Sequence, residues 1–285
     1  MGEQIVRANG VDLCVEPFGD PADPALLLLH GAGNTMLSWD EELCGRLAGG
    51  GRFVIRADGR DAGRSVSSEL GAPRYGLRDL VADGAGLLDS FGVARGHLVG
   101  MSTGAAIAQL MALDHPARVA SLTLASATPG IPGAEAGDLP GASAELFADE
   151  PPQPDWADRA AVIDYLVEAE RPYSPRFDEA AMRTLAGRVV DRSADLAANL
   201  TNQFIIDAGE PWRARLGEVT APTLVVHGTE DPMFPYPHAV ALADEIPGAA
   251  LLPLADTGHE YFPRHTWDLV VPAILRHTDG HASRA

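Results

Sequence analysis

The chain has 285 residues, of which 46% are apolar, enough to bury one large core and still carry an inserted segment. Its formal net charge of −19 disfavours nucleic acid and anionic membranes as partners, because their phosphate groups would be repelled. All 21 basic residues are arginines, which excludes catalysis through a lysine Schiff base and phosphate binding by a Gly-Lys loop.

The first predicted strand with a functional signal covers residues 26–29, which are all leucine. It runs into a glycine-rich turn at residues 30–34. A turn with free backbone amides beside a nucleophile is where we expect the oxyanion of an acyl-transfer intermediate to be bound. We assign one donor to the backbone N–H of Ala32. Without a nucleophile nearby, the same turn would be an ordinary strand-to-helix loop.

A nucleophilic serine is predicted at Ser102, within the pentapeptide Gly-Met-Ser-Thr-Gly that separates an apolar strand from a helical pattern. Such a turn strains the serine backbone and tolerates only small neighbours, which gives Gly100 and Gly104 a steric role. The N–H of Thr103, the residue after the nucleophile, is the predicted second oxyanion donor. The alternative interpretation is a tight turn without catalytic function.

The segment 129–215 differs in character from the rest of the chain. It opens with six prolines and continues with amphipathic helical patterns, clearest at 160–169 and 180–190. We therefore expect a catalytic core in residues 1–128 and 216–285, interrupted by a helical cap at 129–215. Such a cap would exclude water from the reaction and select the substrate. The cap aromatic residues that we assign to substrate binding are Trp156, Tyr165, Phe204 and Trp212.

A strand at residues 221–228 ends in a loop with two carboxylates, Glu230 and Asp231, and a third candidate, Asp256, follows the next strand. One of them is expected to orient a catalytic histidine. Asp231 is preferred because it lies further into its loop and is followed by Pro232, which stiffens the backbone. Asp256 is expected to stabilise its own loop.

The general base is predicted to be His259, in the loop after the short strand at residues 249–254. The order Ser, Asp, His fits groups on successive strand ends of a parallel sheet. His30 and His227 each close a strand before a glycine, and we expect them to hold loop backbone in place. The remaining histidines are interpreted as surface or capping residues, and none shows the spacing of a metal site.

These residues together resemble the α/β-hydrolase superfamily, as does the loop at 58–65, which is similar to its Asp-x-Arg-x-x-Gly-x-Ser loop. Within the superfamily, three segments resemble the aclacinomycin methylesterases, namely residues 18–26, 112–115 and 273–278. The resemblance implies a mostly parallel central sheet flanked by helices, with a helical cap inserted between core strands. Those enzymes hydrolyse a carboxymethyl ester on a tetracyclic polyketide. The resemblance fades across the cap.

The predicted function is that of a serine carboxylic-ester hydrolase acting through an acyl-enzyme, and the resemblance implies a bulky, polyketide-like methyl ester as substrate. The same triad also serves perhydrolases, cofactor-free haloperoxidases, lactonases and carbon–carbon bond hydrolases, which remain open alternatives. A non-catalytic binding protein would be expected to lack a triad member. Epoxide hydrolases and dehalogenases of this fold place aspartate at the position of Ser102.

Two further features concern compartment and cofactors. No basic segment precedes an apolar stretch at the N-terminus, and no apolar run approaches the roughly 18 residues of a membrane helix. Cys14 and Cys44 lack redox or zinc spacing, and predict free thiols in a reducing compartment. We therefore expect a cytoplasmic enzyme that needs no metal or other cofactor and acts on a small-molecule ester.

Overall fold

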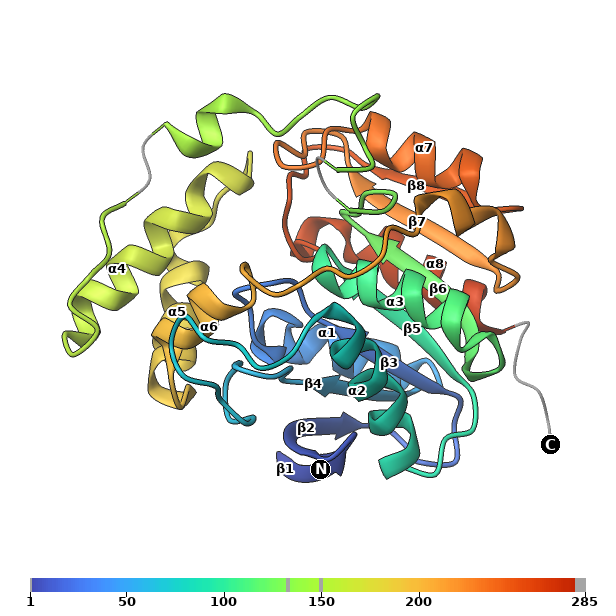
Figure 1. Ribbon diagram of the computed structural model, residues 1–285, viewed down its shortest axis with the longest axis horizontal. Helices are drawn as coiled ribbons and strands as arrows, with labels where there is room; N and C mark the ends of the chain where they lie inside the picture. Colours follow the sequence, from blue (N-terminus) through green and yellow to red (C-terminus); the bar gives the residue numbers. More distant parts are fainter. Residues whose placement is uncertain (1, 132–133, 149–150, 280–285) are drawn as a thin grey trace.

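The computed structural model describes residues 2–131, 134–148 and 151–279 of the chain. It contains one eight-stranded sheet with the spatial order β1-β2-β4-β3-β5-β6-β7-β8 (Figure 1). Strands β3 to β8 pair in parallel, whereas β2 is antiparallel to both of its neighbours. The strands are β1 (Gln4–Ala8), β2 (Val11–Phe18), β3 (Ala25–Leu29), β4 (Phe53–Ala57), β5 (Gly96–Met101), β6 (Val119–Ala125), β7 (Thr223–Gly228) and β8 (Ala250–Leu254).

Helices cover both faces of this sheet. The α-helices are α1 (Glu41–Gly49), α2 (Leu77–Ser90), α3 (Thr103–Asp114), α4 (Arg159–Glu170), α5 (Glu179–Arg192), α6 (Leu196–Asn202), α7 (Pro237–Glu245) and α8 (Trp267–Asp279). Short 3-10 helices are η1 (Met36–Ser38), η2 (Pro116–Arg118), η3 (Ala144–Phe147), η4 (Arg171–Tyr173), η5 (Arg213–Glu218) and η6 (Arg264–Thr266).

The unbroken leucine run of β3 is explained by these two layers of helices. Leu27 and Leu29 belong to a core cluster shared with α2 and α3, whereas Leu26 and Leu28 belong to a second cluster shared with α1 and α8. Successive residues of a strand point to opposite faces of the sheet. A strand that is covered on both faces is therefore apolar at every position.

The strand order places two turns of interest side by side. The chain leaves β3 toward β4 on one side and returns to β5 on the other, so the direction of the strand order reverses at β3. Leu29, at the end of β3, pairs with Gly100 on β5. Ligand sites of open α/β sheets lie outside the carboxyl ends of the strands at such a reversal. The turns that follow β3 and β5 meet at this position.

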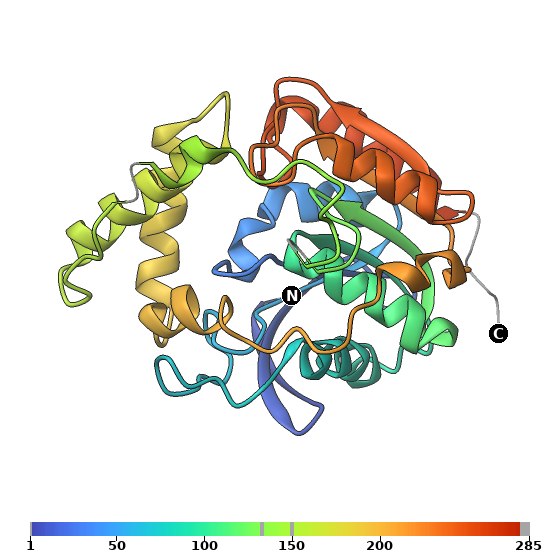
Figure 2. The same cartoon turned by 45° about the horizontal axis from the view of Figure 1, so that its top comes forward.

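The segment between β6 and β7 carries α4, α5 and α6, which form a separate layer at one side of the sheet (Figures 1 and 2). Helices α4 and α5 include the two helical ranges expected from the sequence, 160–169 and 180–190. They pack against each other through a small apolar cluster of their own, formed around Val162, Leu166, Val167 and Ala186.

Trp212 does not belong to this layer. Its side chain is 1% exposed and lies in the core cluster shared with α2 and α3. Its indole Nε1 donates a hydrogen bond to Oε1 of Gln109 on α3, with an N–O distance of 3.0 Å. An indole enclosed in the core has no surface to offer a ligand, which contradicts the expectation that Trp212 contacts the substrate.

Candidate active site

Ser102 lies at the sharp turn between β5 and α3, with backbone angles φ +53° and ψ −116°. A positive φ at a residue other than glycine costs about 1–3 kcal/mol and persists only where the surroundings enforce it. A Cβ atom at Gly100 would overlap the backbone of Gly104, and one at Gly104 would overlap the carbonyl oxygen of Leu29. Both glycines are therefore required sterically, which confirms the reason inferred from the motif.

The loops after β7 and β8 bring Asp231 and His259 together. Nδ1 of His259 lies 2.9 Å from Oδ2 of Asp231. The other carboxylate oxygen, Oδ1, accepts hydrogen bonds from the backbone N–H groups of Met233, at 2.9 Å, and Phe234, at 2.7 Å. A carboxylate fixed in this way holds the proton of the imidazole on Nδ1, which leaves Nε2 free to accept a proton.

The side chain of Asp231 is fully buried, whereas that of His259 is 11% exposed. Burial acts to raise the pKa of Asp231, but the hydrogen bond with His259, the electrostatic interactions with His259 and His227, and the hydrogen bond from the Phe234 amide outweigh it. The pKa of Asp231 therefore lies below its usual value, and the carboxylate is ionised at neutral pH. It can stabilise an imidazolium on His259.

The two competing carboxylates are both exposed. Oδ2 of Asp256 lies 3.3 Å from Nη1 of Arg176, and both side chains are exposed. Glu230 is exposed on its loop. Among the residues that the structure describes, Asp231 is the carboxylate that is hydrogen-bonded to His259.

His227, at the end of β7, contacts the same carboxylate oxygen as His259. Its Nε2 lies 2.7 Å from the carbonyl oxygen of Phe234 and 3.3 Å from Oδ2 of Asp231. Because both neighbours are acceptors, the proton of the neutral ring belongs on Nε2. Burial lowers the pKa of His227, so the ring is neutral. The expected role in holding loop backbone is present, and the additional contact with Asp231 was not foreseen.

The turn after β3 presents one backbone amide without a partner in the described chain. The N–H of Gly31 donates to the hydroxyl of Tyr261 at 2.8 Å, and the N–H of Gly33 donates to Oε1 of Gln203 at 2.9 Å. Between them, the N–H of Ala32 makes no hydrogen bond. Thr103 is the first residue of α3, and its N–H has no partner within the helix. Ala32 and Thr103 can thus both donate to an oxyanion.

Gln203 and Tyr261 were missed by sequence reasoning. Their contacts with the turn join residues 170 and 230 positions apart in the chain, so no local pattern reveals them. Burial also raises the pKa of Tyr261, which keeps its hydroxyl protonated.

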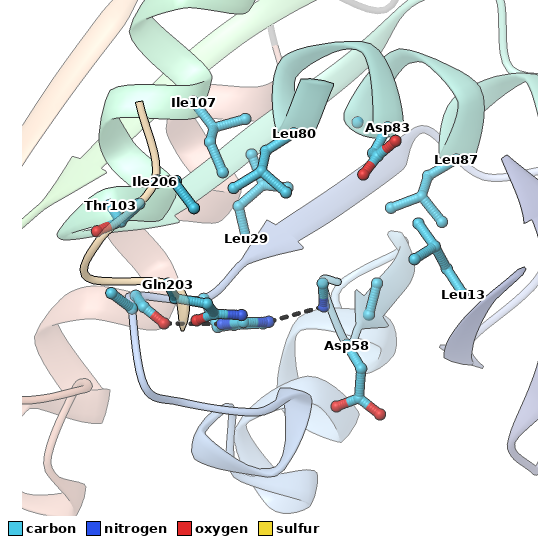
Figure 3. A pocket seen from close by; sticks show the side chains of 16 residues that line it. Leu13, Leu29, Asp58, Leu80, Asp83, Leu87, Thr103, Ile107, Gln203 and Ile206 are labelled. Carbon is cyan, nitrogen blue, oxygen red and sulfur yellow. Dashed lines mark hydrogen bonds between the residues drawn. The ribbon is translucent and has the colours of Figure 1, made fainter. Parts of the chain in front are cut away.

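His30 fixes the base of the same turn, as expected. Its Nε2 accepts a hydrogen bond from the N–H of Gly59 at 2.8 Å, so the ring proton lies on Nδ1, which is 2.8 Å from the Gly31 carbonyl oxygen. Burial lowers the pKa of His30 and keeps the ring neutral. A cavity of about 40 Å³ adjoins residues 30–32, and it is lined mostly by apolar side chains of the sheet and helices, with Asp58, Asp83, Gln203 and Thr103 also at its border (Figure 3).

The other three residues assigned to substrate binding lie in two places. Trp156 and Tyr165 lie in the layer of α4 and α5, and Phe204 lies beside the turn after β3. Trp156 and Tyr165 form an edge-to-face ring pair with centroids 5.9 Å apart, and both pack on the apolar cluster of α4 and α5. The side chain of Phe204 is 66% exposed. It covers the turn after β3, because a Cβ atom at Gly33 would lie 2.9 Å from the Phe204 ring. Phe204 is therefore the best placed of the four to meet a ligand.

Two histidines interpreted as surface or capping residues are in fact buried. His97 lies 2.8 Å from the Ser121 hydroxyl, and His238 lies between the Thr128 hydroxyl and the Pro140 carbonyl, each at 2.8 Å. The surface interpretation was wrong for both, because their polar partners come from distant parts of the chain. His281 lies outside the described residues.

Within residues 2–131, 134–148 and 151–279, no group of three or more His, Cys, Asp or Glu side chains could hold a metal ion. Over the same residues, no helix is long and apolar enough to cross a membrane. Cys14 and Cys44 are free and buried, and burial raises the pKa of their thiols to about 11 and about 12.

The substitution Ala32→Pro tests the backbone donor directly, because proline lacks the N–H. The loss of one oxyanion donor typically lowers turnover by ~10²–10³-fold. Ala32→Gly retains the amide and is expected to be mild. Steady-state kinetics of both variants on one ester provide the comparison. Equal damage from both substitutions would show that the site needs the Ala32 methyl group and not its amide.

The comparisons with known proteins agree with this geometry. The family described as alpha/beta hydrolase fold matches residues 24–266. The chain is 33% identical to the rhodomycin D methylesterases of Streptomyces peucetius and of Streptomyces sp. strain C5, with 98% of each chain covered in both cases. It is 32% identical to a putative carbamate hydrolase of Variovorax paradoxus, over 85% of this chain and 87% of that protein.

Solved structures show the same fold. A Rhodococcus esterase superposes with a TM-score of 0.75 at 22% identity, covering 99% of this chain and 100% of the other. A putative aryl esterase of Burkholderia cenocepacia gives 0.76 at 21% identity, covering 96% and 98%. The sheet, the strained serine turn and the family match together show that the chain belongs to the α/β-hydrolase fold family.

Proposed function

We propose that Ser102, His259 and Asp231 form a catalytic triad that hydrolyses carboxylic esters through an acyl-enzyme. The observation that carries the proposal is the 2.9 Å contact between His259 and the buried Asp231, on the loops that follow β7 and β8. Membership of the family and the similarity to two methylesterases make the chain a hydrolase of the carboxylesterase type.

The reaction follows from these groups. Oγ of Ser102 attacks the ester carbonyl while Nε2 of His259 takes the serine proton, and Asp231 stabilises the imidazolium. The amides of Ala32 and Thr103 bind the oxyanion. The alcohol leaves with the proton from His259, and an acyl-enzyme remains on Ser102. Water, deprotonated by His259, then attacks this second ester, and collapse of the intermediate releases the acid and restores the serine hydroxyl.

We further propose that the natural substrate is a methyl ester of a bulky, fused-ring acid. The alignment with the rhodomycin D methylesterases covers 98% of the chain and therefore runs through the segment 129–215. The exposed ring of Phe204 offers a flat apolar surface beside the oxyanion turn. The net charge of −19 and the free buried thiols fit action on an uncharged ester in the cytoplasm.

Phe204→Ala tests this substrate proposal. Contacts with remote rings contribute to transition-state binding as well as to affinity. The wild type is expected to show a higher kcat/KM for a tetracyclic methyl carboxylate than for p-nitrophenyl acetate, after correction for leaving-group reactivity. Phe204→Ala should lower the value for the tetracyclic ester by about tenfold, since an aromatic contact formed with a substrate ring contributes about 0.5–1.5 kcal/mol beyond the area that it buries. Hydrolysis of the acetate should be nearly unchanged.

Leu269→Ala, which removes an exposed leucine from α8, is the matched control and should affect neither ester. If the acetate remains preferred after correction, or if Phe204→Ala lowers both activities equally, the polycyclic substrate is wrong and a general esterase remains. Product masses from the same screen separate ester hydrolysis from perhydrolase, lactonase and carbon–carbon bond hydrolase activity.

A further inference from the structure

A row of three amide side chains at the end of α6 joins the cap to the core. Asn199 donates from Nδ2 to the carbonyl oxygen of Asn34 at 3.3 Å, and Asn202 donates to Oδ2 of Asp61 at 3.0 Å. Gln203 makes two bonds, accepting from the N–H of Gly33 at 2.9 Å and donating to the carbonyl oxygen of Arg60 at 2.7 Å. Asn199 and Asn202 are fully buried, and Gln203 is 7% exposed.

Asn202 and Gln203 bind different parts of the core. Asn202 binds loop residues beyond β4, because its side chain also reaches the backbone of Glu69 and Gly71. Gln203 instead binds the residue that directly follows Ala32. Its Nε2 also donates to the carbonyl oxygen of Arg60. Arg60 follows Gly59, whose backbone N–H is hydrogen-bonded to His30. Gln203 is thus a cap residue placed on the oxyanion turn.

One side of the turn faces a cavity. The cavity of about 40 Å³ adjoins residues 30–32, and Figure 3 shows Gln203 and Thr103 at its border. A surface that faces a cavity lacks the van der Waals contacts that fix side chains and backbone in a close-packed core. The peptide unit that carries the Ala32 amide is held through its Gly31 carbonyl oxygen by His30 and by the N–H of Asn34. The turn is further held on either side of that amide by the hydrogen bonds from Gly31 to Tyr261 and from Gly33 to Gln203.

We propose that Gln203 is a positioning residue that aligns the Ala32 amide for the oxyanion, so that the cap contributes to transition-state stabilisation as well as to substrate selection. This inference rests on the proposed ester hydrolase function. Gln203 does not itself contact the oxyanion. It acts through the Gly33 amide, and a donor that is misplaced by a fraction of an ångström binds the developing charge less well.

Gln203→Met tests the proposal, because methionine is similar in length and flexibility but has no amide. We expect kcat to fall about tenfold, less than the ~10²–10³ for outright loss of a donor, with KM nearly unchanged. The loss should be the same for p-nitrophenyl acetate and for a bulky methyl ester. Affinity for an alkyl trifluoromethyl ketone, which forms a hemiketal oxyanion with the serine, should fall in parallel with kcat/KM. Affinity for the product acid should not change.

Asn202→Ala is the matched control, since it breaks contacts of the same kind between α6 and the core without touching the oxyanion turn. It should lower the unfolding temperature while leaving kcat and ketone affinity unchanged. If Gln203→Met does not fold, Gln203→Asn replaces it, because the shorter amide cannot reach Gly33 and Arg60 together. The same kinetic pattern is expected.

Four results would overturn the proposal. Gln203→Met could leave ketone affinity unchanged, could act on KM alone, or could impair only the bulky ester, and the last two would make Gln203 a substrate contact. Failure of the wild type to hydrolyse any ester would instead refute the proposed function. The fourth result, turnover of Gln203→Met at the wild-type rate, would refute this inference and leave the proposed function intact.

Discussion

Ser102→Ala is expected to abolish measurable ester turnover while the protein remains folded. Alanine removes only the hydroxyl from a turn whose shape is imposed by Gly100 and Gly104. Without the nucleophile, no acyl-enzyme can form. Residual catalysis of ~10³–10⁴-fold over the reaction in water can persist through the oxyanion donors and binding alone. Turnover of p-nitrophenyl acetate and the circular dichroism spectrum, measured on the same preparation, test both halves of this prediction.

Ser121→Ala is the control for this experiment, because it removes a hydroxyl from the neighbouring strand β6, where the partner is His97. It should retain wild-type turnover. Retention of more than a few per cent of turnover by Ser102→Ala would show that another residue is the nucleophile.

Asp231→Asn should lower turnover by ~10⁴-fold, because an amide cannot hold the histidine tautomer or stabilise the imidazolium. The structure makes this the second largest effect: Asp231 is buried, ionised and bonded to Nδ1 of His259. Asn at this position would also disturb the contact with His227. The measurement is kcat for one small ester, with the unfolding temperature recorded alongside.

Asp256→Asn is the matched control, with the same chemical change in the neighbouring loop. Its carboxylate contacts Arg176 at the surface, and exposed pairs contribute about 0–1 kcal/mol, so its loss should have little effect on turnover. The reverse ranking of the two variants would assign the role of the acid to Asp256.

The parts of the site that could be predicted from the sequence are those encoded locally. The glycines around Ser102 are required by atoms within the turn and at the end of β3. The stretches that carry Asp231 and His259 each follow an apolar strand, and neighbouring parallel strands bring their carboxyl ends to the same edge of the sheet. Local sequence patterns, together with the rule that parallel strands end at the same edge of a sheet, were sufficient to predict Ser102, Asp231 and His259.

The parts that could not be predicted depend on contacts between distant segments. Trp212 lies within the segment 129–215 that was expected to form the cap and is aromatic like the other three residues assigned there, yet Gln109 on α3 binds its indole and the core encloses it. Gln203 carries no motif, and its role emerges only when the end of α6 is found beside the turn after β3. His97 and His238 were misjudged for the same reason, since their partners lie 24 and 110 residues away.

Labelling with an alkyl fluorophosphonate tests the central claim most directly, because this reagent transfers its phosphonyl group to an activated serine and releases fluoride. The chain contains no lysine, so trypsin cleaves only after arginine and releases residues 96–118, in which Ser102 is the only serine. We expect one phosphonyl group per chain, on this peptide, with complete loss of ester turnover. Labelling of a different peptide, or turnover that persists after complete labelling of Ser102, would contradict the assignment of Ser102 as the nucleophile.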